Sequence, residues 1–161
     1  MTRQAWSRWM GWTVVAVVVA DWVSKFLITN RLAVGGHIAV IDRWLYLVHQ
    51  RNAGISFSWF GGAHGWWRTP ALTAVAVVGI VALALLGRTA ARRSTRIGIA
   101  LTLAGAIGNL GDRIVHGGVT DFLLVRYFPF VFNVADIAIT AGALLLAFGL
   151  GTRPAPPKAT A

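Results

Sequence analysis

The sequence lacks both cysteine and glutamate, and only 12% of its residues are charged. Without cysteine, the chain has no disulfides, no thiolate nucleophile and no sulfur ligand for a metal. Hydrophobic residues make up 57% of the chain and occur in long runs, which excludes an ordinary soluble domain. These properties predict a single-domain, all-α polytopic membrane protein that spans residues 1–161.

Basic residues give the chain a formal net charge of +10. They are scattered near the ends of the apolar runs, whereas nucleic-acid-binding proteins gather them on one face with aromatic residues. Membrane topology and anionic lipid headgroups explain this distribution better. We therefore expect membrane lipids as partners and no nucleic acid.

Four apolar stretches predict transmembrane helices, because about 20 residues are needed to cross the hydrocarbon core. Their approximate ranges are 9–29, 70–86, 97–114 and 134–151. The last two reach a spanning length only if they include polar residues at their ends. A cleaved signal peptide is an alternative for the first stretch, because Arg3 and Arg8 precede its apolar core.

The distribution of arginine predicts that both termini are cytoplasmic. Arg3 and Arg8 precede the first stretch, and four more arginines lie between the second and the third. These four are Arg88, Arg92, Arg93 and Arg96. Dense basic residues beside a membrane mark its cytoplasmic side. In this orientation the first and third stretches end, and the fourth begins, at the outer face.

Two regions lie outside the predicted spans. The outer segment, residues 30–69, has β-branched and aromatic residues in partial alternation from His37 to Val48, which predicts short strands. Its tryptophans are typical of the membrane interface, so we expect this extracytoplasmic segment to lie on the bilayer. The tail, residues 153–161, is rich in proline and is predicted to be disordered.

Three of the five aspartates lie near one another in the sequence, at Asp112, Asp121 and Asp136, with Asn109 and Asn133 beside them. Ionisable side chains near membrane depth are costly and therefore indicate a functional site. Two adjacent aspartates can share one proton, so that one activates water while the other protonates a scissile carbonyl. Such a pair hydrolyses amides without a cofactor or a metal.

Other interpretations stay open on spacing alone. The aspartates could pair with Lys25, Arg113 and Arg126 and only hold helix ends together. A magnesium site would use oxygen ligands, although such sites usually recruit substrate phosphates as well. A proton-coupled transporter or channel component would use the carboxylates as a relay. A lipid-binding scaffold would not need the aspartates for catalysis.

Five short motifs follow one another along the chain. They are Asp21-Trp22-Val23-Ser24-Lys25, Asn52-Ala53-Gly54-Ile55-Ser56-Phe57, Gly105-Ala106-Ile107-Gly108-Asn109-Leu110-Gly111-Asp112-Arg113, Gly118-Val119-Thr120-Asp121-Phe122 and Phe132-Asn133-Val134-Ala135-Asp136. In this order they resemble the lipoprotein signal peptidase family, also called signal peptidase II. The resemblance covers nearly the whole chain. It implies an aspartyl endopeptidase of the bacterial cytoplasmic membrane that cleaves prolipoproteins just before a diacylglyceryl-modified cysteine. We also expect the protein to be a monomer.

The resemblance also implies roles for individual residues. Asp121 and Asp136 correspond to the catalytic pair. Expected support residues are Asn109, Asp112, Arg113, Asn133 and Ala135. Candidate substrate contacts are Asp21, Lys25, Asn52 and Gly54. Three positions depart from the family pattern without removing a carboxylate, namely Trp22, Ser56 and Ala104.

Overall fold

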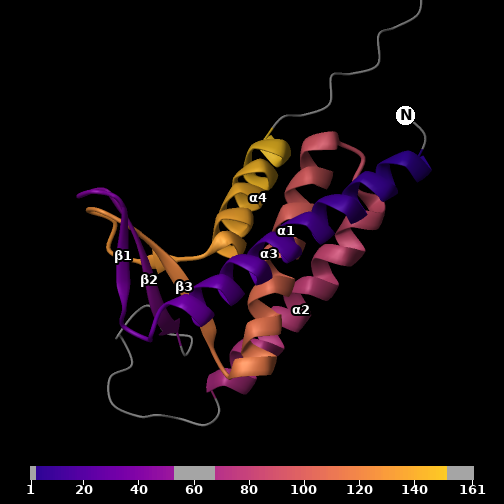
Figure 1. Cartoon of the computed structure of the whole chain (residues 1–161). Helices are drawn as coiled ribbons and strands as arrows, with labels where there is room; N and C mark the ends of the chain where they lie inside the picture. Colours follow the sequence, from indigo (N-terminus) through magenta and orange to yellow (C-terminus); the bar gives the residue numbers. More distant parts are fainter. Residues whose placement is uncertain (1–2, 53–67, 152–161) are drawn as a thin grey trace, which may run out of the picture.

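The computed structural model describes residues 3–52 and 68–151, which form helices and a small sheet (Figure 1). The helices are α1 (Arg3–Arg31), α2 (Arg68–Thr89), α3 (Arg93–His116) and α4 (Val134–Gly151). The strands are β1 (His37–Ile41), β2 (Leu45–Asn52), β3 (Val119–Val125) and β4 (Val131–Phe132). Gly54, Ser56 and the tail predicted to be disordered lie outside the described residues.

The predicted helical character is confirmed, with one helix over each of the four apolar stretches. Within the described residues, two segments are long and apolar enough to cross a bilayer, Arg8–Arg31 of α1 and Thr69–Thr89 of α2. A shorter apolar stretch, Val134–Gly149, lies in α4. Val75 and Val78 of α2 are about two-thirds exposed, as expected for side chains that face lipid. That α3 and α4 also cross the membrane stays a prediction.

α3 lies between the other helices and contacts α1, α2 and α4 (Figure 1). Glycines on α3 allow the close approach of α4. A Cβ atom on Gly105 would collide with the carbonyl oxygen of Ala135, and one on Gly98 would lie 2.9 Å from the carbonyl oxygen of Gly142. Small residues at such interfaces are typical of helix packing in membranes. The start of α4 is therefore held against the C-terminal half of α3.

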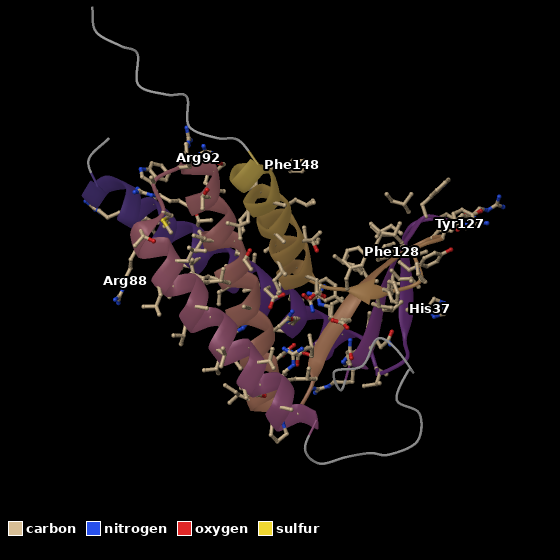
Figure 2. All side chains as sticks on the ribbon, turned by 180° about the vertical axis from the view of Figure 1, so that it is seen from behind. His37, Arg88, Arg92, Tyr127, Phe128 and Phe148 are labelled. Atoms are coloured by element: carbon tan, nitrogen blue, oxygen red, sulfur yellow. The ribbon has the colours of Figure 1, made fainter. Side chains whose placement is uncertain are left out.

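Arginines hold the helices together at the end remote from the sheet. Arg92 Nη1 donates to the carbonyl oxygen of Gly149 at 2.7 Å, and Arg96 Nε donates to that of Ala90 at 2.6 Å. Both carbonyls lie at or just beyond helix C-termini, where a cation is favourable. Figure 2 shows Arg92 at this end and Tyr127, in the connection between β3 and β4, at the opposite end. Arg92 and Arg96 thus also stabilise the packing at this end of the helices.

The four strands form one antiparallel sheet in the order β1-β2-β3-β4. The strands predicted between His37 and Val48 are confirmed as β1 and the first half of β2, whereas β3 and β4 were not predicted. The β2–β3 register places Gln50 opposite Asp121 and ends at Asn52. Because β2 precedes α2 and β3 follows α3, this pairing joins two connections that are distant in the sequence.

Short links fix the sheet to the helices. α3 ends at His116 and is capped by Gly117, whose φ of 73° favours glycine and whose N–H donates to the carbonyl oxygen of Arg113 at 3.0 Å. On the other side, His49 Nδ1 of β2 lies 2.8 Å from the carbonyl oxygen of Leu32, just after α1. The sheet is therefore held beside the end of α1, the end of α3 and the start of α4.

Candidate active site

α4 begins with a reciprocal pair of hydrogen bonds between Asn133 and Asp136. The Asn133 Oδ1 accepts from the backbone N–H of Asp136 at 2.9 Å, and the Asp136 Oδ2 accepts from the backbone N–H of Asn133 at 3.2 Å. This arrangement is a capping box, which satisfies N–H groups that a helix start leaves without partners. A negative charge is also favourable there because of the helix dipole. The helix start thus orients the Asp136 carboxylate.

α1 contributes a second group to the same helix start. The backbone N–H of Ala135 donates to Asp21 Oδ1 at 2.9 Å. This approach needs Gly108 on α3, because a Cβ atom there would lie 2.6 Å from Asp21 Oδ2. Ala135, one of the predicted support residues, is fully buried. Three helices therefore meet where α4 begins.

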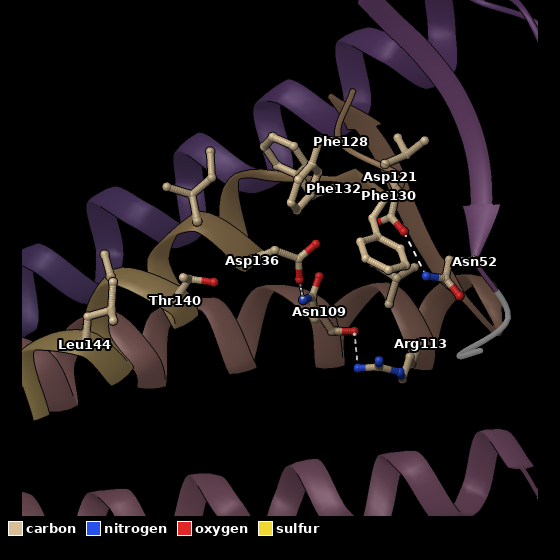
Figure 3. A pocket seen from close by; sticks show the side chains of 14 residues that line it. Asn52, Asn109, Arg113, Asp121, Phe128, Phe130, Phe132, Asp136, Thr140 and Leu144 are labelled. Carbon is tan, nitrogen blue, oxygen red and sulfur yellow. Dashed lines mark hydrogen bonds between the residues drawn. The ribbon is translucent and has the colours of Figure 1, made fainter. Parts of the chain in front are cut away.

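Three asparagines surround the two aspartates that the family resemblance singles out. Asn133 Nδ2 donates to Asp121 Oδ1 at 2.7 Å, and Asn52 Nδ2 donates to Asp121 Oδ2 at 2.9 Å. Asn109 Nδ2 donates to Asp136 Oδ1 at 2.8 Å. Figure 3 shows Asp121 approaching from β3 and Asp136 from α4. Asn133 contacts both aspartates and so bridges them.

Both aspartates line one cavity of about 630 Å³ (Figure 3). Its other polar side chains include Asn52, Asn109 and Arg113. The apolar wall continues from the aspartates along one face of α4 and across the β3–β4 connection. Its residues are Val119, Phe128, Phe130, Val131, Phe132, Ile137, Ala141 and Leu144, with Thr140 among them. The cavity therefore joins two carboxyl groups to an apolar channel beside α4.

The Asp121 carboxyl is buried on β3, outside the predicted spans. Burial raises its pKa to about 6 because the charged form loses hydration, and the nearby Asp136 acts in the same direction. The hydrogen bonds from Asn52 and Asn133 and the charge of Lys25 oppose this shift without cancelling it. Asp121 therefore holds a proton at pH values at which an exposed aspartate is ionised.

A second buried group lies beside the cavity and contains a cation. Lys25 Nζ lies 2.7 Å from Asp21 Oδ2 and 3.2 Å from Asp112 Oδ2, and it donates to Asn109 Oδ1 at 3.1 Å. Asp112 Oδ2 also accepts from the backbone N–H of Thr120 at 2.8 Å. The exposed fractions of Asp21, Lys25 and Asp112 are 1%, 4% and 7%. This group ties α1 to α3 and to the start of β3.

The interpretation that aspartates form ion pairs that hold helix ends together thus applies to Asp21 and Asp112. Within residues 3–52 and 68–151, Asp121 and Asp136 make no ion pair. Arg126 instead donates to a carbonyl oxygen, that of Arg43, at 3.3 Å. In the same ranges, no group of three or more histidines and acidic residues could hold a metal ion.

The residues predicted to contact substrate lie in different places in the structure. Asn52 lines the cavity, whereas Asp21 and Lys25 are buried behind Asn109 and are not among its described lining residues. Gly54 lies outside the described residues. The predicted support residues Asn133, Asp112 and Arg113 lie at or beside the cavity, and Arg113 Nη1 donates to the carbonyl oxygen of Asn109 at 3.4 Å.

Sequence reasoning did not identify the aromatic wall formed by Phe128 and Phe130. Their repeated spacing up to Phe132, directly before Asn133, was a usable signal. The capping box was also readable, because an asparagine three residues before an acidic residue and an apolar run is its signature.

Comparison with known proteins identifies a matching family. The family described as Signal peptidase (SPase) II matches residues 13–151. The lipoprotein signal peptidase of Pseudomonas syringae pv. tomato is 43% identical over 92% of this chain and 86% of its own length. That of Klebsiella aerogenes is 37% identical over 95% of this chain and 93% of its own length.

Two solved structures, each described as a bacterial membrane enzyme, have the same fold. One superposes with a TM-score of 0.81 at 27% identity and covers 90% of this chain and 94% of its own. The other has a TM-score of 0.79 at 27% identity, with coverage of 88% and 86%.

Proposed function

The chain belongs to the signal peptidase II family and cleaves signal peptides from prolipoproteins, and we propose that Asp121 and Asp136 activate the water for this cleavage. The observation that carries the proposal is that both carboxyl groups line one cavity and are bridged by Asn133. Neither is neutralised by a cation within the described residues. The enzyme is then an aspartic endopeptidase.

In the proposed mechanism, the ionised member of the pair takes a proton from water as the water oxygen attacks the scissile carbonyl carbon. The protonated member donates its proton to the carbonyl oxygen, which gives a neutral tetrahedral intermediate. When the intermediate collapses, the carbon–nitrogen bond breaks, the carboxyl that took the proton from water gives it to the leaving nitrogen, and the other carboxyl takes a proton from a hydroxyl group of the intermediate. The pair ends with one proton again, and no covalent bond to the enzyme forms.

The proposed substrate is a prolipoprotein with a diacylglyceryl-modified cysteine, cleaved just before that cysteine. Its acyl chains stay in lipid, which holds the scissile bond near the membrane surface. The apolar channel beside α4, with Ile137, Ala141 and Leu144, offers a lipid-compatible path to the aspartates. A cavity with an apolar wall and few polar groups suits such a substrate.

We propose that residues 1–161 form one integral membrane domain of the bacterial cytoplasmic membrane, that all four helices cross, and that both termini are cytoplasmic. Arg92 and Arg96 lie at the end of the helices remote from the sheet, which supports this orientation. The site then lies near the outer face, with the sheet on the membrane surface. The enzyme acts as a monomer in contact with membrane lipids.

The alternative of a proton-coupled transporter has no support. A relay requires polar groups through the depth of the membrane. Here the buried ionisable side chains gather where α1 ends, α3 ends and α4 begins, whereas α2 is apolar from Ala71 to Leu86 apart from Thr73 and Gly79.

The test uses purified protein in lipid nanodiscs, a diacylglyceryl-modified prolipoprotein and gel detection of the released signal peptide. Asp121→Asn and Asp136→Asn should each abolish cleavage. The matched control is Asp42→Asn, because the side chain of Asp42 is 87% exposed in the β1–β2 turn. If either active-site variant folds and keeps near wild-type turnover, the proposed pair is wrong.

A further inference from the structure

Among the described residues that line the cavity, Thr140 alone has a hydroxyl group. We propose that Thr140 is a specificity-determining residue whose hydroxyl donates a hydrogen bond to an ester carbonyl of the diacylglyceryl group on the substrate. The inference deepens the proposed function and rests on it, because it names a contact that holds the lipid part of the substrate beside the aspartate pair.

Thr140 lies on the face of α4 that lines the cavity. Asp136, Thr140 and Leu144 follow one another at intervals of four residues, so they lie in a row on one side of the helix. Figure 3 shows this row, with the Thr140 oxygen on the side of Asp136. Four residues of an α-helix rise by about 6 Å. The hydroxyl therefore lies one turn along the channel from the Asp136 carboxyl.

The Thr140 hydroxyl makes no hydrogen bond within its own helix. Threonines in apolar helices can donate to the carbonyl oxygen one turn earlier, as Thr102 of α3 does to Gly98 at 2.8 Å. Thr140 Oγ1 makes no such bond, and it makes no other hydrogen bond within residues 3–52 and 68–151. A hydroxyl without a partner is costly in apolar surroundings, so a bound group that accepts from it gains affinity.

The proposed substrate supplies a matching acceptor. A diacylglyceryl group joins each acyl chain to glycerol through an ester, and an ester has no N–H or O–H group and can only accept hydrogen bonds. Only the cysteine and the glycerol carbons separate these esters from the scissile bond. When the scissile carbonyl lies at the aspartate pair, an ester carbonyl therefore reaches the first turn of α4 beyond Asp136.

The surroundings of Thr140 favour an uncharged group. Ile137, Ala141 and Leu144 flank it in the channel, and α4 has no charged side chain after Asp136. A charged headgroup or a free anion would lose its hydration there without an opposite charge on α4. An ester between acyl chains instead suits one hydroxyl among apolar side chains.

The experiment compares two synthetic prolipoprotein substrates that differ only in how the lipid is linked to glycerol. One carries ester-linked acyl chains, and the other carries ether-linked alkyl chains of equal length and so lacks the carbonyl acceptors. Wild-type protein in lipid nanodiscs should cleave the ester substrate with a kcat/KM about fivefold higher, mainly through KM. Thr140→Val keeps the shape of the side chain and should lower this ratio to about one, by slowing cleavage of the ester substrate alone.

Further variants separate the hydrogen bond from a structural role. Thr140→Ser retains a hydroxyl and should retain the preference for the ester substrate. The matched control is Thr102→Val, which should leave the ratio unchanged, because Thr102 is bonded within α3 and is not among the described lining residues. If Thr140→Val keeps the wild-type ratio, or slows cleavage of both substrates equally, the ester contact is refuted. Thr140→Ala repeats the test should Thr140→Val not fold.

The failure of this inference differs from failure of the proposed function. If wild-type protein cleaves both substrates equally well while Asp121→Asn and Asp136→Asn are inactive, the aspartate pair stands and only the ester contact is wrong. If either aspartate variant keeps near wild-type turnover, the pair is wrong, whatever the ratio between the substrates. Cleavage of neither substrate by wild-type protein would contradict the proposed substrate, and the inference with it.

Discussion

Two groups of aspartates lie side by side in this molecule and differ in what surrounds them. Asp21 and Asp112 share the ammonium group of Lys25 and are enclosed by α1, α3 and β3. Asp121 and Asp136 have no cation partner within the described residues, accept hydrogen bonds mainly from asparagines and line a cavity. The residue type is the same in both groups, so the hydrogen-bond and charge partners distinguish them.

The difference teaches how one residue type can serve structure and chemistry at once. A cation paired with two carboxylates fixes charge and geometry, but it leaves no carboxyl ready to exchange a proton. Amide donors orient a carboxyl with a dipole and not with a full opposite charge, so the carboxyl can still exchange a proton. The charged group therefore suits a support, and the amide-bound pair suits acid–base chemistry.

The largest expected effect comes from replacing a single carboxyl group, and the property that changes should depend on which of the two groups of aspartates loses it. Asp136→Asn should lower kcat/KM about 10³-fold or more with little change in melting temperature, because an asparagine can still accept in the capping box. Asp112→Asn should instead lower the free energy of unfolding by about 1–3 kcal/mol, since it weakens a buried hydrogen bond to a charge. Gel assays and thermal unfolding in the same detergent measure both. Equal effects of the two variants on both measurements would contradict the distinction between a pair suited to acid–base chemistry and a group that supports the structure.

Removing the cation should have the largest effect on stability, although it should affect catalysis less than the loss of Asp136. Lys25→Met leaves Asp21 and Asp112 buried without their shared partner, and breaking a buried ion pair costs about 3–5 kcal/mol. Arg43→Met is the control, because its pair with Asp42 is fully at the surface at 3.9 Å. Thermal unfolding of both variants gives the comparison. A Lys25→Met protein as stable as the control variant would contradict the support role.

The pH dependence should come from the amide-bound pair. The pKa of Asp121 is raised above its ordinary value, so this carboxyl keeps its proton up to about pH 6 and loses it above. The pair then has no acid, and kcat/KM should fall by about 100-fold between pH 6 and pH 8. The same sign applies to stability, which should decrease as pH rises towards 6 because the folded state binds the extra proton. In Asp121→Asn this component of the stability profile should be absent.

The smallest expected effect concerns the apolar channel. Ala141→Trp should narrow the channel beside α4 and lower kcat/KM roughly tenfold, mainly through KM, because it excludes part of the apolar substrate. Ala143→Trp on the exposed face of α4 is the matched control. Steady-state cleavage assays separate KM from kcat. If both variants behave alike, the channel does not bind substrate.

The sequence predicted the meeting of the helix ends but only part of the site. Arginine density and four apolar stretches were enough to bring Asp21, Asp112 and Asp136 to one level, because helix length and direction are local properties. The position of Asn52 against Asp121 depends on pairing between β2 and β3, which are 69 residues apart at this contact. Spacing along the chain does not encode such a contact.

The role of Lys25 was also beyond sequence reasoning. Its position four residues after Asp21 predicts an ion pair on one helix face, and that pair is present. The contacts with Asp112 and Asn109 depend on how closely α1 approaches α3, which Gly108 permits through the absence of one Cβ atom. The distance between two helices at this precision depends on how their side chains pack, and the spacing of residues along the sequence does not predict it.

The capping box at the start of α4 has a consequence for the biogenesis of the protein. The residues that begin this helix, Asn133 and Asp136, also complete the aspartate pair, and they leave the ribosome after Asp21, Asn109 and Asp121. A nascent chain that extends only to the end of β3 therefore has one carboxyl of the pair and no bridging asparagine. Under the proposed mechanism, hydrolytic competence is thus acquired only when α4 docks against α3.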